Sequence, residues 1–192
     1  MQPDDSTKPV VVREPDASKD ARPVLRGGSS REARSLPSNP AFEQARTRFV
    51  EGLAHFGAAR WAEAEQSFEA ALALMPGRPS VLTNLGATRL RLGRPAEALE
   101  LAKAETLARP ASAGLWELRA RAESALGRRL AQHRSLAEVY AIQGNYAESA
   151  NQLALARAAG DGDFFEQSAV DSRLREVRVL LEEQLRESRQ QR

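Results

Sequence analysis

Histidines are the first residues to test for chemistry, because two histidines one helical turn apart can bind zinc. The chain contains only His55 and His133, which lie far apart in the sequence, and neither is followed by Glu. The HExxH zinc motif requires both histidines on one turn together with that glutamate. Cysteine is absent, which removes thiolate ligands and thiol nucleophiles. We therefore predict no metal site, and we expect both histidines to be structural.

Carboxylates are the second group that could do chemistry, since general acid–base catalysis uses two of them in a shared desolvated cleft. The acids of this chain are instead spaced along amphipathic segments, as are Glu63, Glu65 and Glu69 or Glu182 and Glu183. We expect these side chains on solvated helix surfaces. No GxxxxGK[ST] run is present to bind a nucleotide phosphate. The sequence predicts a protein that is not an enzyme and that needs no cofactor.

The elements that position these side chains are predicted to be helices. Ala and Leu dominate the 192 residues, and aromatic residues make up only 5%. The net charge of +2 is too small to indicate nucleic acid binding by itself. No stretch approaches the roughly 18 to 20 apolar residues of a membrane span, and the N-terminus lacks the basic and apolar regions of a signal peptide. We expect a soluble, cytoplasmic protein.

Residues 1–40 differ in composition from the rest of the chain. They contain six of the ten prolines, no aromatic residue, and six acidic against seven basic side chains. Such a segment buries too little apolar surface to offset the entropy of ordering. We predict a disordered N-terminal tail, which is either a solubilising linker or the carrier of a short docking motif. A helical domain is predicted to follow over residues 41–188.

An internal echo organises the helical part. The residues that recur at one constant separation are the pairs Gly52 and Gly86, Ala59 and Gly93, Ala64 and Ala98, and Pro76 and Pro110. A fixed period of about 34 residues, with small residues and a closing proline at matching positions, is typical of stacked helical hairpins. Such arrays bind other proteins far more often than they catalyse reactions.

These positions resemble the tetratricopeptide repeat, which combines a large residue, Leu-Gly, Ala, an apolar residue, Ala and Pro. The matching residues are Leu82, Leu85, Gly86, Gly93, Ala98, Ala102 and Pro110 in the second period, and Gly52, Trp61, Ala64, Phe68, Ala71 and Pro76 in the first. The resemblance implies an all-α fold, a right-handed α-solenoid of helical hairpins closed by a C-terminal capping helix.

The repeats are expected at about 45–78 and 79–112, followed by an irregular segment at 113–129 and a further repeat at 130–163. The helix near 130–142 is predicted to serve both as the second helix of one hairpin and as the first of the next. A capping helix is expected at 163–188, with Asp163 and Glu166 as its N-terminal cap.

The C-terminal half, roughly residues 127–181, also resembles the repeat domain of bacterial HExxH zinc metalloproteases linked to outer-membrane assembly. The residues that carry this resemblance are His133, Leu136, Ala137, Tyr140, Gly144, Ala150, Leu153, Ala156, Asp163, Phe164, Asp171, Arg173, Leu174 and Glu176. The resemblance covers only the non-catalytic part of that family.

In tetratricopeptide arrays the first helix of each hairpin lines an inner groove, and the resemblance implies such a groove here. The predicted groove residues are Arg46, Phe49, Leu53, Phe56, Thr83, Asn84, Ala87, Leu90 and Arg91. The first helix contributes mostly apolar side chains, which favours a protein or peptide partner with apolar segments and acidic flanks, unless the tail or a second protomer covers the groove. The chaperone-binding subtype is disfavoured, because Phe49 and Leu53 stand where that subtype has Lys and Asn.

A second candidate surface is a predicted basic patch, and its residues are Arg119, Arg121, Arg128, Arg129 and Arg134. This patch is suited to an acidic protein or a phosphate backbone, although no aromatic residues interleave to stack bases. The sequence therefore predicts a non-enzymatic adaptor that binds a partner segment in the groove. The alternatives are an accessory module of a protease or envelope-assembly system and, less favoured, a nucleic-acid-associated regulator.

Overall fold

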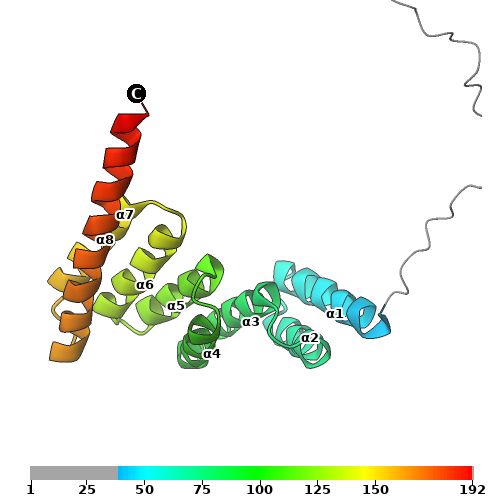
Figure 1. Cartoon of the computed structure of the whole chain (residues 1–192). Helices are drawn as coiled ribbons and strands as arrows, with labels where there is room; N and C mark the ends of the chain where they lie inside the picture. The colour runs from blue at the N-terminus through cyan, green and yellow to red at the C-terminus, as the bar shows by residue number, and fades with distance from the viewer. Residues whose placement is uncertain (1–38, 192) are drawn as a thin grey trace, which may run out of the picture. The chain divides into compact units, whose positions relative to one another are not determined.

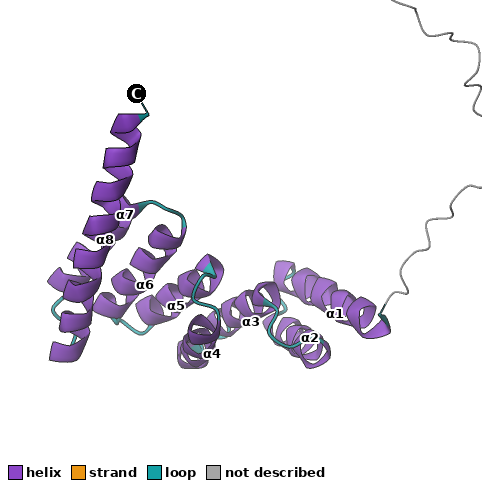
Figure 2. Ribbon diagram, viewed as in Figure 1, coloured by secondary structure: helices purple, strands orange, loops and turns teal. Residues whose placement is uncertain are grey.

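The structure is a computed structural model that describes residues 39–191. Within this range the chain forms eight α-helices and no strand (Figures 1 and 2). The helices are α1 Pro40–Gly57, α2 Trp61–Leu74, α3 Pro79–Arg91, α4 Pro95–Ala108, α5 Ala113–Ala125, α6 Arg129–Ile142, α7 Tyr146–Ala158 and α8 Phe164–Gln190. The predicted N-terminal tail lies outside the described residues, apart from its last two positions.

The helix starts follow local sequence signals. Proline occupies the first position of α1, α3 and α4, where its missing N–H group costs no hydrogen bond. Asn39 accepts a hydrogen bond from the amide of Ala41 at the start of α1. At the start of α8, Asp163 and Glu166 each accept a hydrogen bond from the other's backbone amide, at 2.8 and 3.1 Å. This is the capping box that the sequence predicts.

Four inter-helix turns share one hydrogen-bond pattern. In each, a residue with positive φ follows the helix, and the next amide donates to the carbonyl five residues back at 2.9 Å. The positive-φ residues are Ala59, Gly93, Gly127 and Gly144. The first three are equally spaced at the separation of the echo, so the period continues through α5 and α6, and the segment 113–129, expected to be irregular, contains a regular helix and turn. The fourth turn follows after only half that separation.

The packing of the helices agrees with these turns. Each helix contacts the next one in the chain, and α3 also contacts both α1 and α5. In the view of Figure 1, α1 and α3 lie above α2 and α4. We call α1, α3 and α5 the first helices and α2 and α4 the second helices. At the C-terminal end α8 packs on α7 and also contacts α6.

Small residues let the helices of a hairpin approach closely. Ala64, Ala98 and Ala122 are completely buried. A methyl group added at Gly52 would lie 2.5 Å from the ring of Phe68, which is itself fully buried. These contacts explain why the echo repeats small side chains at fixed offsets along the chain.

Glu65 is not on a solvated surface as predicted, whereas the other four acids named in that prediction are exposed. Glu65, with only 14% of its side chain exposed, accepts hydrogen bonds from Arg89 at 3.2 Å and from Arg94. The hydrogen bond to Glu65 is the main cause that raises the pKa of Arg94. Glu123 is also buried, and it bonds to Arg119 in the same helix. Glu123 also accepts a hydrogen bond from Ser135 of α6, so both acids link neighbouring helices instead of facing water.

The start of α6 is capped by a residue from a distant part of the chain. The carboxylate of Asp161, in the α7–α8 loop, accepts hydrogen bonds from the amides of Arg129 at 2.6 Å and Leu130 at 2.9 Å. The bond from the Leu130 amide is the largest cause that lowers the pKa of Asp161. The loop thus supplies the side-chain cap that Arg128, the residue before α6, does not provide.

Together, the helix order, the consecutive packing and the C-terminal helix confirm the predicted fold class. The described residues form an all-α solenoid of helical hairpins that α8 closes. None of its helices is long and apolar enough to cross a membrane.

Candidate functional site

The predicted groove residues come from two neighbouring helices. Arg46, Phe49, Leu53 and Phe56 lie on α1, and Thr83, Asn84, Ala87, Leu90 and Arg91 lie on α3. Since α3 contacts both α1 and α5, the three first helices form one layer. We call the solvent-facing side of this layer, to which the predicted groove residues are assigned, the first-helix surface.

The two aromatic residues predicted for the groove on α1 contribute mainly to the core. The Phe49 ring centroid lies 5.9 Å from that of the buried Phe68, and the Phe56 ring packs edge-on against Trp61 at 4.9 Å. Both Phe49 and Phe56 are half-buried. Substitution of either one would therefore disturb the first hairpin.

The large exposed apolar residues of α1 are Leu53 at 40%, Val50 at 56% and Phe42 at 41%. With Arg46 these residues recur at spacings of three and four positions, so they share one face of the helix. The sequence analysis missed Val50 and Phe42. The helical spacing from Leu53 was the signal that could have found them.

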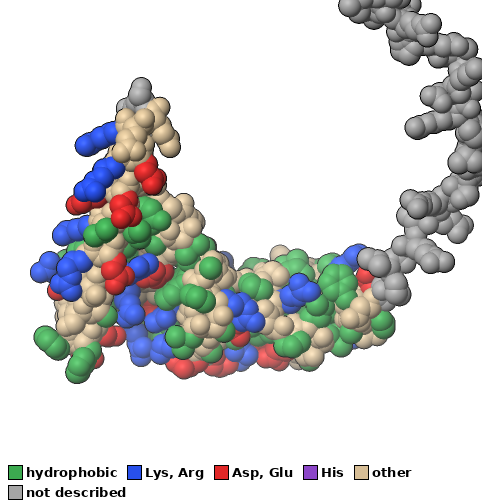
Figure 3. Space-filling model, in the orientation of Figure 1, with side chains coloured by type: hydrophobic (Ala, Val, Ile, Leu, Met, Phe, Trp, Pro, Cys, Tyr) green, Lys and Arg blue, Asp and Glu red, His purple; other side chains and the backbone are tan. Residues whose placement is uncertain are grey.

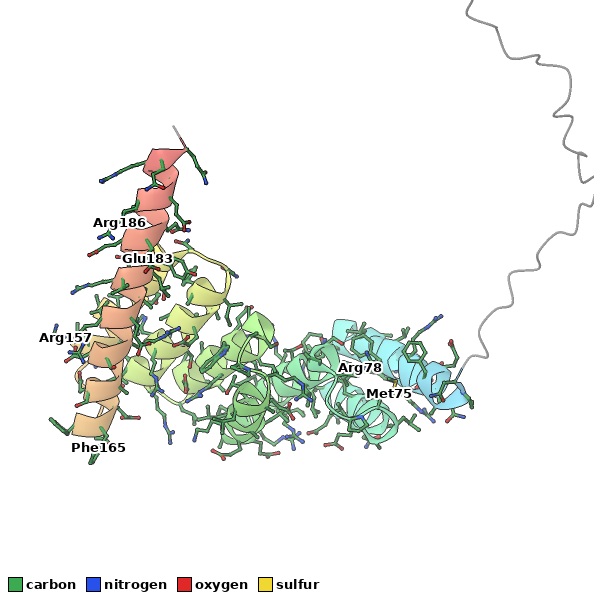
Figure 4. All side chains as sticks on the ribbon, in the orientation of Figure 1. Met75, Arg78, Arg157, Phe165, Glu183 and Arg186 are labelled. Atoms are coloured by element: carbon green, nitrogen blue, oxygen red, sulfur yellow. The ribbon has the colours of Figure 1, made fainter. Side chains whose placement is uncertain are left out.

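A first hollow, the α1–α3 pocket, opens on this face with a volume of about 180 Å³. Its walls are largely apolar, and its lining residues are Phe42, Ala45, Arg46, Phe49, Ala71, Met75, Arg78, Ser80 and Val81. The guanidinium of Arg78 lies 5.9 Å from the centroid of the Phe42 ring. Its Nη2 atom is 4.0 Å from the sulfur of Met75, and Figure 4 shows these two residues close together beside α1. Two arginines therefore border an apolar hollow.

A second hollow, the α3–α6 pocket, has a volume of about 390 Å³. Its lining residues come from α3, α5 and α6, and they are Leu90, Ala120, Arg121, Ser124, Ala125, Gln132 and Leu136. The pocket brings Leu90, predicted for the groove, together with Arg121, predicted for the basic patch. The first-helix surface therefore includes α5, whose Ser124 and Ala125 the sequence analysis did not assign to it.

The polar groove residues of α3 are partly engaged with their own helix. The Thr83 hydroxyl donates to the carbonyl oxygens of Pro79 and Ser80, and the Asn84 side-chain amide donates to the Ser80 carbonyl at 2.7 Å. Ala87 is half-buried. This stretch of α3 thus presents few unused hydrogen-bond donors.

Arg91, at the end of α3, is exposed and stacks over an aromatic ring. Its guanidinium carbon lies 5.8 Å from the centroid of Trp61. Within the described part of the chain Arg91 forms no ion pair, so its charge is not compensated by a nearby carboxylate.

The five residues of the predicted basic patch have different surroundings. Arg119 points inward, where its Nε atom donates to Glu123 at 2.9 Å and its guanidinium lies 5.2 Å from the Trp116 ring. Arg129 donates to the Ala159 carbonyl at 2.9 Å. Only Arg121 lies in a pocket of the first-helix surface, whereas Arg128 borders a separate hollow with Asp161 and Glu166. Arg134, on α6, lines neither of these pockets.

The residues tested for chemistry are dispersed. Nδ1 of His133 lies 2.9 Å from the side-chain oxygen of Gln152, which links α6 to α7. His55 lies in the last turn of α1. No group of three or more potential metal ligands occurs among residues 39–191.

The tetratricopeptide repeat family model matches residues 55–122, which extend from the end of α1 into α5. The match supports the tetratricopeptide repeat for this segment. It ends before residues 127–181 begin, so the resemblance of that half to the metalloprotease repeat domain stays a prediction. No curated protein matches the chain.

Several solved structures are similar to the chain in fold. The Arabidopsis OM64 TPR domain is 18% identical with a TM-score of 0.44, covering 71% of this chain and 98% of that one. The Sgt2 TPR domain from Aspergillus fumigatus is 19% identical with a TM-score of 0.42, covering 74% and 82%. PcrH, in complex with the chaperone binding region of PopD, is 22% identical with a TM-score of 0.49, covering 68% and 93%. At these identities the likeness is one of fold alone.

Proposed function

We propose that the chain is a non-enzymatic scaffold that binds a segment of another protein on its first-helix surface. The observation that carries this proposal is the exposed apolar face of α1, which lies beside the α1–α3 pocket. Helix α3, which packs against α1, leads from this pocket to the α3–α6 pocket. Grouped exposed apolar side chains next to hollows commonly mark a site for a partner.

The structure improves the choice of variant for testing this proposal. Leu53 is 40% exposed on the first-helix surface, and a carboxylate placed there would contact solvent in the free protein and meet the partner in a complex. Leu53→Glu should therefore abolish partner binding without unfolding the chain. Phe49→Glu would instead disturb the packing of Phe49 against Phe68.

The matched control is Leu107→Glu, because Leu107 lies on the second helix α4 and is 84% exposed. Both variants and the unaltered chain are immobilised, and partners captured from a lysate of the source cells are quantified by mass spectrometry. A protein that binds the unaltered chain and the Leu107 variant, but not the Leu53 variant, supports the proposal. If the Leu53 variant, shown to be folded by circular dichroism, recovers the same partners, the first-helix surface is not the binding site.

The alternative of an accessory module in a protease or envelope-assembly system rests on the resemblance of residues 127–181. Two of the residues that carry it have structural roles in the fold. Arg173 donates two hydrogen bonds to Glu138 at 2.7 and 2.9 Å, and Asp171 pairs with Arg157 at 3.3 Å. Recovery of a metalloprotease or a membrane-assembly factor by the unaltered chain would favour this alternative. A nucleic-acid role is less favoured because Arg119, one of the predicted patch residues, bonds to the buried Glu123.

A further inference from the structure

The two pockets of the first-helix surface differ in charge from other hollows of the described unit. Neither the α1–α3 pocket nor the α3–α6 pocket has a carboxylate among its lining residues, and each has at least one arginine. Three other hollows all include carboxylates, namely Glu97 and Glu100, Glu43 and Glu51, or Asp161 and Glu166. In the view of Figure 3, acidic side chains gather instead along the edge of the unit where α4 lies.

Four other arginines have carboxylate partners, within one helix or between helices. Arg89 and Arg94 share Glu65, Arg109 pairs with Glu105, and Arg173 pairs with Glu138. The guanidinium groups of these four arginines are therefore engaged by carboxylates of the fold.

The arginines of the two pockets have weak ion pairs or none among the described residues. Within residues 39–191, Arg121 forms no ion pair, and the Arg78 side chain donates a hydrogen bond only to the Met75 sulfur. Arg46 approaches Glu43 only to 3.8 Å, with 68% and 48% of the two side chains exposed. Such a surface pair contributes little and can exchange for a better partner. One acid, Glu117, lies on the same side of α5 as Arg121, and it forms no ion pair either within the described range.

We propose that the partner segment is acidic as well as apolar. Its apolar side chains enter the α1–α3 and α3–α6 pockets, and neighbouring carboxylates bind Arg46 or Arg78 in the first and Arg121 in the second. This inference rests on the proposed function and names the chemistry of its partner. A guanidinium binds a carboxylate through two parallel hydrogen bonds, and an apolar wall beside it strengthens that pair by excluding water.

The apolar part of the lining favours a protein over a nucleic acid as the source of the negative charge. Beside the polar Arg121, Ser124 and Gln132, the α3–α6 pocket is lined by Leu90, Ala120, Ala125 and Leu136, and it contains no aromatic ring for base stacking. A phosphate backbone would bring charge without apolar groups to fill the hollow. A segment that combines leucine-like and glutamate-like side chains supplies both.

The test selects binders from a library of short random peptides displayed on phage, using the intact chain as bait. The expected result is an enrichment of peptides in which Asp or Glu lies within a few positions of Leu, Ile, Met or Phe. Selected peptides are then synthesised with both ends capped and with a free C-terminal carboxylate, which separates side-chain carboxylates from a terminal one. Their affinities are measured by fluorescence anisotropy.

Charge reversal makes the test specific for the pocket. Arg121→Glu should weaken binding of the acidic peptides by about tenfold or more, because a favourable pair becomes a like-charge contact. Replacing the peptide acids by lysine should restore binding to this variant. The matched control is Arg175→Glu on α8, an exposed arginine that forms no ion pair among the described residues and that should leave the affinity unchanged.

The outcomes separate this inference from the proposed function. Peptides that lack acidic residues, but whose binding is lost in the Leu53→Glu variant, would overturn the acidic preference and leave the surface as a binding site. Peptides selected equally well by the Leu53→Glu variant would overturn both. Displacement of the acidic peptides by single-stranded DNA at equal concentration would show that the arginines recognise phosphate, and it would overturn the assignment to a protein partner.

Discussion

Replacing Arg119 by methionine is expected to destabilise the hairpin of α5 and α6 strongly, although arginine is usually a surface residue. Arg119 donates to Glu123 at 2.9 Å, and Glu123 is only 1% exposed. The second oxygen of Glu123 accepts a hydrogen bond from the Ser135 hydroxyl of α6 at 2.6 Å. In the methionine variant the buried Glu123 carboxylate would lose Arg119 and keep only the hydrogen bond from the Ser135 hydroxyl. A buried charge without its counter-charge is among the most unfavourable arrangements in a protein interior.

The size of the effect follows from the burial of the pair. Removing one partner of a buried ion pair costs about 3–5 kcal/mol. Since 19% of the Arg119 side chain is exposed, water can partly compensate, and we expect about 3 kcal/mol, the lower end of that range. In a chain of this length each kcal/mol lost from the free energy of unfolding lowers the melting temperature by about 2–4 °C, so the variant should melt about 6–12 °C below the unaltered chain.

Differential scanning calorimetry at pH 7 checks this prediction, with Arg175→Met as the control for loss of an exposed arginine. The double variant Arg119→Met/Glu123→Met should regain much of the lost stability, because two apolar side chains then replace the pair. If the single variant melts within about 2 °C of the unaltered chain, the reasoning is refuted, since Glu123 would then not depend on Arg119. The same follows if the double variant is less stable than the single one.

Three further changes test the packing, capping and docking of the helices. Gly52→Ala should lower the urea midpoint by the equivalent of about 1–3 kcal/mol, because the buried Phe68 ring cannot move aside, whereas Gly57→Ala, with no atom within 4 Å, should be neutral or stabilising. Asp161→Asn removes one of the two hydrogen bonds that this side chain accepts from backbone amides, so the variant should melt at a lower temperature than the unaltered chain at pH 7. Because folding depresses the pKa of Asp161, that stabilisation is present above the unfolded pKa of about 3.9 and is lost as the pH falls through the folded value; the two melting curves should therefore converge in acid. Arg173→Met should cost about 1.5–3 kcal/mol and speed amide hydrogen exchange in α8, and unchanged exchange would show that α8 does not depend on this contact.

The hairpin array was predictable because its signals are local. The echo of small residues and closing prolines, the proline at the start of α4 and the capping box of α8 can each be read along the sequence without knowing the fold. The ion pairs were not predictable in this way. Glu65 meets Arg89 and Arg94 across 24 and 29 positions, and Asp161 caps a helix that begins 32 positions earlier. Nothing in the spacing of these residues reveals which helices will be neighbours.

Helix geometry explains why Arg119 does not share a surface with Arg121, its neighbour in the predicted basic patch. Arg119 and Arg121 are two positions apart, which places their side chains about 200° apart around the helix axis. Arg119 therefore faces the core, where it donates a hydrogen bond to Glu123, and Arg121 faces the α3–α6 pocket. Residues that are clustered in sequence on a helix share a surface only at spacings of three or four. The same rule, applied to α1, extends the groove from Leu53 to Val50.

The shift in the period after α6 explains where the larger pocket lies. In the first part of the unit, neighbouring first helices contact each other: α1 contacts α3, and α3 contacts α5. Within the described range, however, the backbones of α5 and α7 are not in contact. Instead α6 contacts α8, and α6 is joined to α7 by the turn that elsewhere joins the two helices of a hairpin. Helix α6 therefore has the role of a first helix as well as a second one. Because it has this double role, it can contribute Gln132 and Leu136 to the same hollow as α3 and α5. The break in the repeat thus accompanies a pocket whose arginine, Arg121, has no ion pair among residues 39–191, and the acidic partner proposed above would be recognised where the array departs from its period.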